Sequence, residues 1–510
     1  MNANVAGFLR ETARRDPQGT GLVVGERRMT WAQVDAEVDA LAAGLVQRGL
    51  HAGDRIALLL GNSAEFVVAY FGAARAGLVS VPMNPASSAA EVAVLLADAG
   101  ARVLLVQPST LEVGSQAAAA LPGCEVIEAG GAEWQSIIAA GRGAVLAEPA
   151  TSQDALALLL FTAGTSGRPK GAMLTHGALR SNIEMLLSLD SPPAVTPDDV
   201  VLLLLPMFHV YGLNTGLGLA VAAGATIVIS DRFDPEESLA TVRDLGVTTI
   251  PAAPAMFQAW SGVPDAREAL AAVRLLSSGG SPLPADVLER FTSHAGHDVF
   301  EGYGMTETAP VVATTLVSGS AKPGSVGRPL PGLQVRLVDD TGPGGSGRDV
   351  DEGDPGELWV RGPSIFSGYW PNGEGGPDAD GWFRSGDVAY LDEDGDLHLV
   401  DRRREVILVN GFSVYPREIE LVIDQMPEVR ESAVVGVPDD ASGEAVTALV
   451  VCRPGASATV EQIAQFCAER LARFKCPTTI RIVDALPHSA TGRVAKGRLR
   501  EVYGDAGYGA

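Results

Sequence analysis

The side chains with the clearest chemical capacity lie in one short loop that follows an apolar run. The run Leu156–Phe161 is short enough to form a buried strand, and glycines, hydroxyl side chains and one lysine come directly after it. Glycine lets backbone N–H groups approach an anion closely, hydroxyl groups donate hydrogen bonds, and a lysine supplies positive charge. The expected phosphate-binding residues are Thr162, Gly164, Thr165, Ser166, Gly167 and Lys170.

This loop differs from the Walker A loop, whose pattern is G-x-x-x-x-G-K-[ST]. Gly164 and Gly167 lie three residues apart here, and Pro169 comes directly before Lys170. A flexible linker is the alternative interpretation, but linkers are seldom adjacent to a buried strand. We therefore expect a strand, a phosphate-binding loop and then a helix over Thr175–Leu187.

Three other stretches carry groups that would serve an ATP site. Tyr303 lies between two glycines and offers an aromatic face for adenine, and Glu307 is a hard oxygen ligand of the kind that Mg²⁺ prefers. Asp387, in a Ser-Gly-Asp turn, can accept hydrogen bonds from ribose hydroxyls. The basic cluster 401–405 has two interpretations from its residues alone, a solvated charge run or a domain junction.

Alternating helices and strands must position these groups. Thr30-Trp-Ala-Gln33 predicts a capping box that opens a helix, and Arg55–Leu60 and Ser63–Ala76 predict the next strand and helix. The alternation is typical of a doubly wound, mostly parallel sheet, in which ligands collect where strands end in loops. From Gly324 the pattern changes to short strands with turn signals. The acidic stretch 391–397 lacks EF-hand spacing, so we expect a β-turn there.

Length, net charge and cysteine count limit the classes of protein to which this chain can belong. A chain of 510 residues exceeds what one hydrophobic core usually holds, so at least two domains are expected. The net charge of −24 would repel a phosphate backbone and an anionic membrane surface, so we expect no nucleic-acid partner. The four cysteines are too few and too irregularly spaced for a disulfide framework or a zinc site, which favours a reducing, cytoplasmic location.

One uncharged stretch raises the alternative of a membrane span. Residues 201–230 contain no Asp, Glu, Lys or Arg, which is long enough to cross a bilayer. Pro206, His209, Asn214 and several glycines interrupt it, so we expect a strand, loop, helix and strand buried in a large α/β core instead. The start of the chain lacks a basic segment followed by an apolar core, so we expect no signal peptide.

Together these motifs make the chain resemble the adenylate-forming superfamily, which includes acyl-CoA synthetases, aryl-CoA ligases, luciferases and peptide-synthetase adenylation domains. The resemblance covers nearly the whole length. It is carried by the stretches Phe161-Thr-Ala-Gly-Thr-Ser-Gly-Arg-Pro-Lys-Gly171, Gly302-Tyr-Gly-Met-Thr-Glu-Thr308, Gly356-Glu-Leu-Trp-Val-Arg-Gly-Pro363, Ser367-Gly-Tyr-Trp370, Gly381-Trp-Phe-Arg-Ser-Gly-Asp387, Asp401-Arg402 and Asn410-Gly-Phe-Ser-Val-Tyr-Pro-Arg-Glu-Ile-Glu420.

The resemblance implies a two-step ligase that uses ATP, coenzyme A and Mg²⁺. A carboxylate attacks the α-phosphate of ATP to give an acyl-adenylate and pyrophosphate, and a thiol, usually that of coenzyme A, then gives the thioester and AMP. Because negative charge develops in both steps, positioning and electrostatics should supply the catalysis. By motif, Thr306 would touch the α-phosphate and Glu307 would hold Mg²⁺. The nucleotide would otherwise be bound by Thr162, Thr165, Ser166 and Lys170 at the phosphates, Tyr303 and Gly280 at adenine, and Asp387 and Arg402 at the ribose.

The resemblance also implies a domain plan. We expect an α/β protein with a large N-terminal domain of doubly wound mixed sheets, residues 1–400, which includes a β-rich subdomain at about 324–400. A small mobile α+β domain, residues 405–510, would follow a hinge at 401–404 and pivot at Arg404 between the half-reactions. In the thioester-forming pose Gly411 would let the pantetheine pass closely.

One position departs from the family pattern. The C-terminal motif P-x-T-x-T-G-K carries a lysine whose ammonium bridges the substrate carboxylate and the α-phosphate, and here Arg493 takes its place. Arg keeps the charge, but its planar fork is not equivalent to a compact ammonium. We expect either a weakened adenylation step or a protein that mainly uses preformed adenylates. Lys496, one helical turn further on, is the alternative source of the charge.

The class of acid substrate is predicted from the absence of cationic side chains in the expected acyl pocket. The family places a residue near the acyl group at the position of His209, where a buried structural histidine is the alternative. The segments expected to wall the acyl pocket, 210–219, 249–257 and 308–315, carry no Lys or Arg, so a second carboxylate would stay unpaired. We therefore expect a monocarboxylic acid, fatty or aryl, with a medium-to-long fatty chain favoured.

Three other classes stay open. A carrier-protein ligase would need a separate acyl carrier protein, because no G-G-x-S carrier segment occurs in the chain. A luciferase would oxidise its adenylate, and no residue distinguishes that outcome. A non-catalytic nucleotide- or acyl-binding homologue is suggested by Arg493 alone.

Overall fold

A computed structural model describes residues 3–119, 121–144, 151–162, 169–339, 347–351, 353–402, 405, 407–409, 412–439, 443–471, 473–488 and 494–504. The chain forms two compact units. The first contains Met1–Gln334 and Arg361–Phe383, and the second contains Val335–Val360 and Arg384–Ala510. Most of the expected β-rich subdomain is therefore grouped with the C-terminal residues, and the domain boundary at 401–404 stays a prediction.

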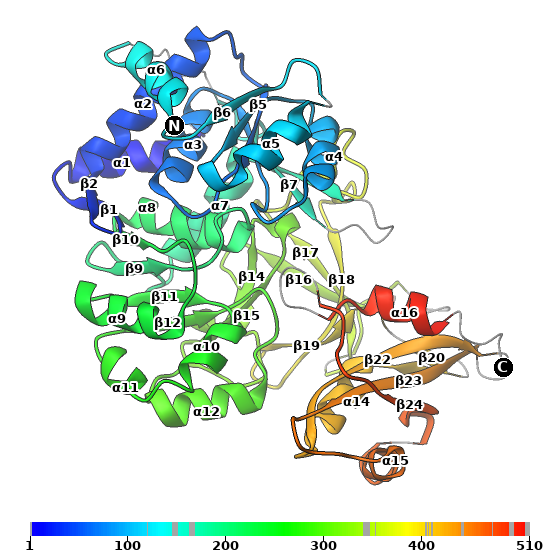
Figure 1. Ribbon diagram of the computed structural model, residues 1–510. Helices are drawn as coiled ribbons and strands as arrows, with labels where there is room; N and C mark the ends of the chain where they lie inside the picture. The colour runs from blue at the N-terminus through cyan, green and yellow to red at the C-terminus, as the bar shows by residue number, and fades with distance from the viewer. Residues whose placement is uncertain are drawn as a thin grey trace. The chain divides into compact units, whose positions relative to one another are not determined.

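Two sheets organise the first unit (Figure 1). The six-stranded sheet has the order β6-β5-β3-β4-β7-β8 and is parallel except for β8. Its strands are β3 (Arg55–Leu59), β4 (Val79–Pro82), β5 (Ala101–Val106), β6 (Glu125–Glu128), β7 (Leu156–Thr162) and β8 (Lys170–Thr175).

The second sheet has nine strands in the order β15-β14-β13-β12-β11-β9-β10-β1-β2. Its centre is parallel, and antiparallel pairs close both ends. The strands are β1 (Thr20–Val24), β2 (Arg27–Thr30), β9 (Val200–Leu203), β10 (Thr226–Ile229), β11 (Thr249–Ala252), β12 (Leu275–Ser278), β13 (Phe300–Gly304), β14 (Val311–Thr314) and β15 (Arg328–Pro329).

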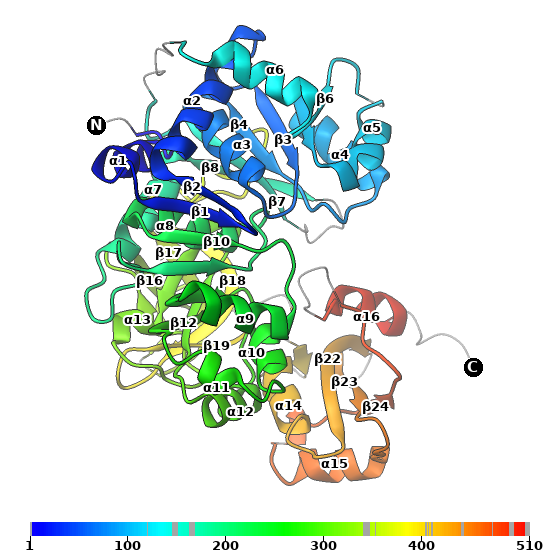
Figure 2. The same cartoon turned by 60° about the vertical axis from the view of Figure 1, so that its left-hand side comes forward.

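Helices cover both sheets because the strands are apolar on both faces. In β3, Ile56 and Leu58 belong to one buried cluster while Ala57 and Leu59 belong to another, where α4 and α5 pack (Figure 1). Helices α9, α10 and α12 lie along the second sheet (Figure 2). The helices of this unit are α1 (Gly7–Arg15), α2 (Trp31–Gln47), α3 (Ala64–Arg75), α4 (Ala89–Ala99), α5 (Leu111–Ala118), α6 (Ala132–Gly141), α7 (His176–Leu187), α8 (Leu219–Ala223), α9 (Pro235–Leu245), α10 (Pro254–Trp260), α11 (Ala266–Ala269), α12 (Ala285–Ala295) and α13 (Thr315–Ser318).

Local signals in the sequence set several helix starts. Thr30 and Gln33 form the expected capping box at the start of α2, with hydrogen bonds of 3.3 and 2.8 Å. Ser63 caps α3 by accepting a hydrogen bond from the Phe66 amide. The predicted start of the first α/β pattern is therefore confirmed.

The segment after the phosphate-binding loop differs from the prediction. The loop does not run directly into a helix, because β8 comes first and pairs antiparallel with β7, from Thr162 opposite Lys170 to Leu156 opposite Thr175. The predicted helix 175–187 is found as α7, which begins at His176 with Thr175 as its cap. Lys170 thus begins a strand, and backbone hydrogen bonds to the distant segment 367–370 hold that strand on its other edge.

The uncharged stretch 201–230 folds as predicted into a strand, a loop, a helix and a strand. The helical part is the π-helix Tyr211–Gly218 continued by α8, and the strands are β9 and β10. In the described part of the chain, no helix combines the length and the apolar character needed to cross a membrane.

The second unit contains two further sheets. One has the order β16-β17-β18-β19, and its strands are β16 (Gln334–Val338), β17 (Gly356–Arg361), β18 (Phe383–Leu391) and β19 (Leu397–Arg402). The acidic stretch 391–397 joins β18 to β19 as the expected turn, with Leu391 opposite Leu397. The other sheet has the order β21-β20-β23-β22 with β24 beside β23. Its elements are β20 (Ile407–Val409), β21 (Phe412–Val414), β22 (Val429–Asp439), β23 (Gly443–Cys452), β24 (Thr479–Ile482), α14 (Pro416–Ile423), α15 (Val460–Ala468) and α16 (Lys496–Gly504).

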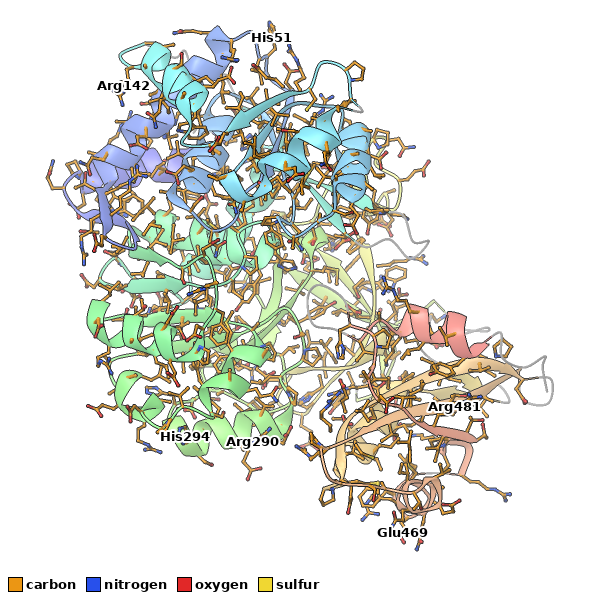
Figure 3. The ribbon with its side chains drawn as sticks, viewed as in Figure 1. His51, Arg142, Arg290, His294, Glu469 and Arg481 are labelled. Atoms are coloured by element: carbon orange, nitrogen blue, oxygen red, sulfur yellow. The ribbon has the colours of Figure 1, made fainter. Side chains whose placement is uncertain are left out.

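The labelled Arg142, Arg290 and Glu469 lie at the outside of their units (Figure 3). Apolar side chains form the core of each unit, and a few charged residues, among them Glu301, Glu307 and Asp387, are also buried. The expected fold class, an α/β protein with large mixed sheets and a smaller α+β C-terminal part, is confirmed.

Candidate active site

The described ends of the phosphate-binding loop lie side by side. Thr162 ends β7 and Lys170 begins β8, and the Thr162 hydroxyl donates a 3.4 Å hydrogen bond to the Lys170 carbonyl. The Lys170 side chain is exposed. The remaining predicted residues of the loop, Gly164, Thr165, Ser166 and Gly167, lie outside the described residues.

Glu307 faces the same region from the 3₁₀ turn Thr306–Thr308, which follows β13. Its residue exposure is 9%, and its Oε1 accepts a 2.7 Å hydrogen bond from the Tyr369 hydroxyl. The Tyr369 ring in turn lies under the Lys170 ammonium, 5.1 Å from Nζ to the ring centre. Tyr369 therefore connects Lys170 to Glu307, two residues that the sequence predicted separately.

Two buried asparagines hold the turn that carries Glu307. The Asn182 amide on α7 donates to the Val311 carbonyl at 2.8 Å and accepts from the Val311 N–H at 3.2 Å. Asn214, in the π-helix, donates to the Ala309 carbonyl at 2.7 Å. Ala309 has a φ of 63°, a left-handed conformation that costs about 1 kcal/mol or more for a residue with a Cβ. These hydrogen bonds help to hold the turn in that strained conformation.

The sequence contained a signal for these asparagines that was not used. Asparagine is unfavourable inside helices because its side chain competes for backbone hydrogen bonds. Asn182 and Asn214 nevertheless lie inside helical segments and are buried. A buried asparagine inside a helix indicates a tertiary contact of the amide, which here is the turn after Glu307.

The predicted adenine-binding residues lie at the ends of β12 and β13. Gly280 follows β12 with a φ of 84°, so its glycine is needed for a left-handed backbone. Tyr303 is 8% exposed on β13. A Cβ at Gly279 would lie 3.0 Å from the ring of Tyr211, so the absence of a side chain there admits this ring. The Tyr211 hydroxyl is 3.5 Å from the Ser277 hydroxyl.

His209 is half-buried and lies just before the π-helix that begins at Tyr211. Its Nδ1 accepts a 3.3 Å hydrogen bond from the Tyr211 N–H, and its own N–H donates to the Pro206 carbonyl. The π-helix that follows is a rare conformation that is frequent at functional sites. The position of His209 near an acyl group stays a prediction.

Gly304 belongs to the predicted adenine-binding motif, yet it has a structural role. A Cβ at Gly304 would lie 2.0 Å from the Pro310 carbonyl oxygen, so β13 and β14 could not approach each other with any other residue there. This glycine is therefore explained by the close approach of two backbones.

Glu301 is a buried carboxyl group that the sequence did not single out. It is 8% exposed on β13, and its Oε1 has no hydrogen-bond partner among the described residues. Burial raises its pKa to about 7, although the backbone N–H groups of Gly324 and Leu283 donate to the carboxylate and oppose that rise. Through Leu283, Glu301 anchors the loop that contains Gly280.

The other predicted residues belong to the second unit. Asp387 on β18 is 9% exposed and pairs in register with Arg402 on β19, whose side chain lies outside the described residues. Arg404, Gly411 and Arg493 also lie outside them.

Lys496, the alternative source of charge, begins α16. Its Nζ lies 2.7 Å from Glu420 and 3.2 Å from Glu405. Its side chain is 13% exposed, so these are largely buried ion pairs. The positive charge of Lys496 is therefore already paired with two carboxylates of the second unit.

The described residues fit a magnesium site of one particular kind. No group of three or more His, Cys, Asp or Glu side chains in the described part of the chain could hold a metal ion by itself. Mg²⁺ is commonly bound by one or two carboxylates together with substrate phosphates and water. The Glu307 carboxylate suits that arrangement, because one of its oxygens is held by Tyr369, whose ring contacts Lys170.

Comparison with known proteins identifies the family. The sequence model of the AMP-binding enzyme family matches residues 9–370. The family model of the AMP-binding enzyme C-terminal domain matches residues 418–493. A feruloyl-CoA synthase of Amycolatopsis sp is 35% identical over 96% of this chain and 97% of its own. A long-chain-fatty-acid–CoA ligase of Yersinia pestis is 33% identical over 93% of this chain and 90% of its own. ATP-bound MatB from Rhodopseudomonas palustris superimposes with a TM-score of 0.91 at 34% identity, covering 99% of this chain and 100% of that chain.

The fold, the loops at the strand ends and these relatives define an AMP-forming acyl-CoA synthetase, a ligase that binds ATP. The chain belongs to the family of AMP-binding enzymes, over both its large N-terminal part and its C-terminal domain. The predicted membership of the adenylate-forming superfamily is confirmed.

Proposed function

We propose that this acyl-CoA synthetase activates a monocarboxylic acid, with a fatty acid favoured, and transfers the acyl group to coenzyme A. The observation that carries the proposal is the charge of the three segments expected to wall the acyl pocket. Residues 210–219, 249–257 and 308–315 all lie within the described chain and contain no charged side chain. A second carboxylate buried there without a cation would cost several kcal/mol.

An aryl acid is the second candidate. The similarity to feruloyl-CoA synthase favours it, and the long-chain-fatty-acid–CoA ligases favour a fatty acid. Both acids have one carboxylate and an apolar body, so the uncharged segments fit either of them.

The proposed roles in the first unit follow the motifs. Thr306 contacts the α-phosphate during attack by the carboxylate, and Lys170 stabilises the charge that develops on the pyrophosphate. Tyr303 and Gly280 border adenine, and His209 lies near the acyl group. The other phosphate ligands are Thr162, Gly164, Thr165, Ser166 and Gly167.

Magnesium is proposed as the cofactor. When bound, it neutralises phosphate charge and stabilises the leaving pyrophosphate. Glu307 would hold it with one carboxylate oxygen while Tyr369 holds the other. A single protein carboxylate is enough because the phosphates supply further oxygen ligands.

The proposed roles in the second unit concern the ribose and the thiol. Asp387 and Arg402 bind the ribose, and Gly411 lets the pantetheine arm approach. We place the hinge at 401–404, with the pivot at Arg404, so that residues 405–510 reorient between the half-reactions.

A panel of acids tests the proposed substrate class. We expect AMP release with dodecanoate or ferulate to exceed that with malonate by about tenfold or more, which is about 1.4 kcal/mol of differential binding to the transition state. AMP release is measured for each acid with coenzyme A, with a phosphopantetheinylated acyl carrier protein, and with neither. Turnover of malonate equal to that of dodecanoate would contradict the proposal, and release only with the carrier protein would assign a different acceptor.

The proposed cation at the reacting carboxylate is Arg493. Its planar guanidinium matches the compact ammonium of the family lysine imperfectly, so adenylation is weakened. Lys496 is a poor substitute, because Glu405 and Glu420 already hold its ammonium at 3.2 and 2.7 Å.

The Arg493→Lys variant is expected to raise acid-dependent ATP–pyrophosphate exchange by about tenfold, because a compact ammonium fits between the two anionic groups. Lys496→Arg, which keeps both ion pairs, serves as the control and should leave exchange unchanged. Lys496→Ala should lower the thermal midpoint but not the exchange rate of the folded enzyme, since two largely buried carboxylates, Glu405 and Glu420, lose their ammonium partner. If Arg493→Lys changes nothing while Lys496→Ala abolishes exchange at an unchanged midpoint, the assignment of Arg493 is wrong.

A further inference from the structure

Tyr369 occupies an unusual place between two oppositely charged groups. Its hydroxyl donates a 2.7 Å hydrogen bond to Glu307, and its ring lies 5.1 Å from the Lys170 ammonium. Among the described residues no ion pair of 4.0 Å or less joins the Lys170 ammonium to a carboxylate, so Lys170 is not paired with Glu307. A lysine and a glutamate on neighbouring elements would ordinarily be free to form an ion pair.

The surroundings of Tyr369 fix it in that place. The Trp370 N–H donates to the Gly171 carbonyl at 2.8 Å, and the Gly368 carbonyl accepts from the Met173 N–H at 3.1 Å, so the segment is bonded to β8. On its other side, the Phe366 N–H donates to the Glu307 carbonyl at 2.9 Å. Backbone hydrogen bonds therefore tie this segment both to the strand of Lys170 and to the turn of Glu307.

The ring orientation is also constrained. The Phe366 ring packs edge-on against the Tyr369 ring, with 5.0 Å between centres and 76° between planes. Phe366 is itself buried and packs against Phe383. The tyrosine cannot turn its face away from Lys170 without disturbing this aromatic cluster.

The hydroxyl of Tyr369 is suited to be a donor. A phenol carries its proton near neutral pH, so the Tyr369 hydroxyl can donate that proton in its 2.7 Å hydrogen bond to the Glu307 carboxylate. A neutral donor satisfies one carboxylate oxygen without neutralising the carboxylate. An aromatic face attracts the lysine without neutralising the ammonium.

We propose that Tyr369 is a positioning residue that keeps Lys170 and Glu307 apart and oriented, so that both retain their charge for the bound nucleotide. Without it, the lysine and the glutamate would pair with each other, and neither charge would be fully available to the phosphates or to Mg²⁺. This inference rests on the roles proposed above for Lys170 and Glu307.

Two substitutions separate the two contacts. Tyr369→Phe keeps the ring and removes the donor, so the Glu307 carboxylate loses its orientation and the Mg²⁺ concentration for half-maximal exchange should rise by about threefold to tenfold. The KM for ATP at saturating Mg²⁺ should change little. Tyr369→Leu also removes the aromatic face, and the ion pair that it permits should raise the KM for ATP by about tenfold beyond the Phe variant.

The control is another tyrosine of the first unit. The Tyr70 hydroxyl is buried without a partner in the described chain, so Tyr70→Phe removes a hydroxyl of the same kind away from the site. We expect its Mg²⁺ dependence and KM for ATP to match those of the wild type. Thermal midpoints of all variants show whether a loss of activity follows a loss of structure.

The experiment measures ATP–pyrophosphate exchange across a Mg²⁺ series, together with ATP binding in the absence of acid. The inference is overturned if Tyr369→Phe leaves the Mg²⁺ dependence unchanged, or if the Phe and Leu variants lose activity only in proportion to their thermal midpoints. Glu307→Gln and Lys170→Ala are measured beside them. If these two lose exchange while the Tyr369 variants behave as wild type, the proposed site stands and the positioning role fails; if neither loses exchange, the proposed site itself fails.

Discussion

Replacing Glu307 by glutamine is expected to lower acid-dependent ATP–pyrophosphate exchange by about a hundredfold to a thousandfold. The amide has the same shape and can still accept the hydrogen bond from Tyr369, so only the negative charge is lost. A neutral amide is a much weaker ligand for a hard divalent cation than a carboxylate. Because the metal helps to stabilise charge in the transition state, kcat should fall along with the affinity for Mg²⁺.

The stability of this variant should not fall in parallel. Glu307 is 9% exposed, and removing the charge of a buried carboxylate relieves desolvation. Glu65→Gln is the control. Glu65 lies on α3, forms a 2.9 Å ion pair with Arg27 and has no proposed role in the site. Exchange is measured with excess Mg²⁺ and again with Mn²⁺. Exchange within threefold of the wild type would remove Glu307 from the proposed metal site.

The Glu301→Gln variant is expected to change how stability depends on pH. Burial raises the pKa of this carboxyl from 4.5 to about 7 in the folded protein, so between these values the folded state binds more protons than the unfolded state. Stability therefore falls as pH rises through this window and levels off above it. Integrated over the window, the loss is roughly 3 kcal/mol.

Glutamine removes this titration and can still accept the hydrogen bonds from the Gly324 and Leu283 amides. Its free energy of unfolding, relative to the wild type, should increase by roughly 3 kcal/mol between pH 4.5 and pH 8. His176, whose pKa burial lowers to about 4, contributes the opposite slope below its unfolded value, and the subtraction cancels it because both proteins carry it. Urea unfolding at several pH values provides the measurement, and parallel curves for the two proteins would show that folding does not raise the pKa of Glu301.

Much of the first unit could be predicted from local patterns. The capping box at Thr30, the alternating runs that became β3 and β4, and the turn at 391–397 all depend on residues close together in the chain. Such signals act over one or two turns of backbone, so reading them requires no knowledge of distant contacts. The helix α7 was predicted to within one residue, but the strand β8 before it was not predicted, since β8 is held partly by hydrogen bonds to residues 367–370.

The structural roles of individual residues within a motif were harder to predict from the sequence. The sequence placed Gly304 in an adenine-binding motif, but the 2.0 Å between its would-be Cβ and the Pro310 oxygen shows that strand packing requires it. The buried Asn182 and Asn214 gave only a weak signal, because a helix pattern does not say what a polar residue will meet. Glu301 was missed because burial decides its chemistry, and no local pattern records burial.

The sequence by itself determined the class of chemistry: residue types and spacing around Lys170, Tyr303 and Glu307 predicted an ATP site, and the resemblance of the motifs to the adenylate-forming superfamily implied a ligase. Only the tertiary structure decided how these residues act together. Tyr369 lies 62 residues from Glu307 in the chain, and it reaches Glu307 because β8, the turn after β13 and the segment 367–370 are bonded side by side. Spacing along a chain fixes which groups one segment presents, whereas sheet topology brings distant segments into hydrogen-bond distance.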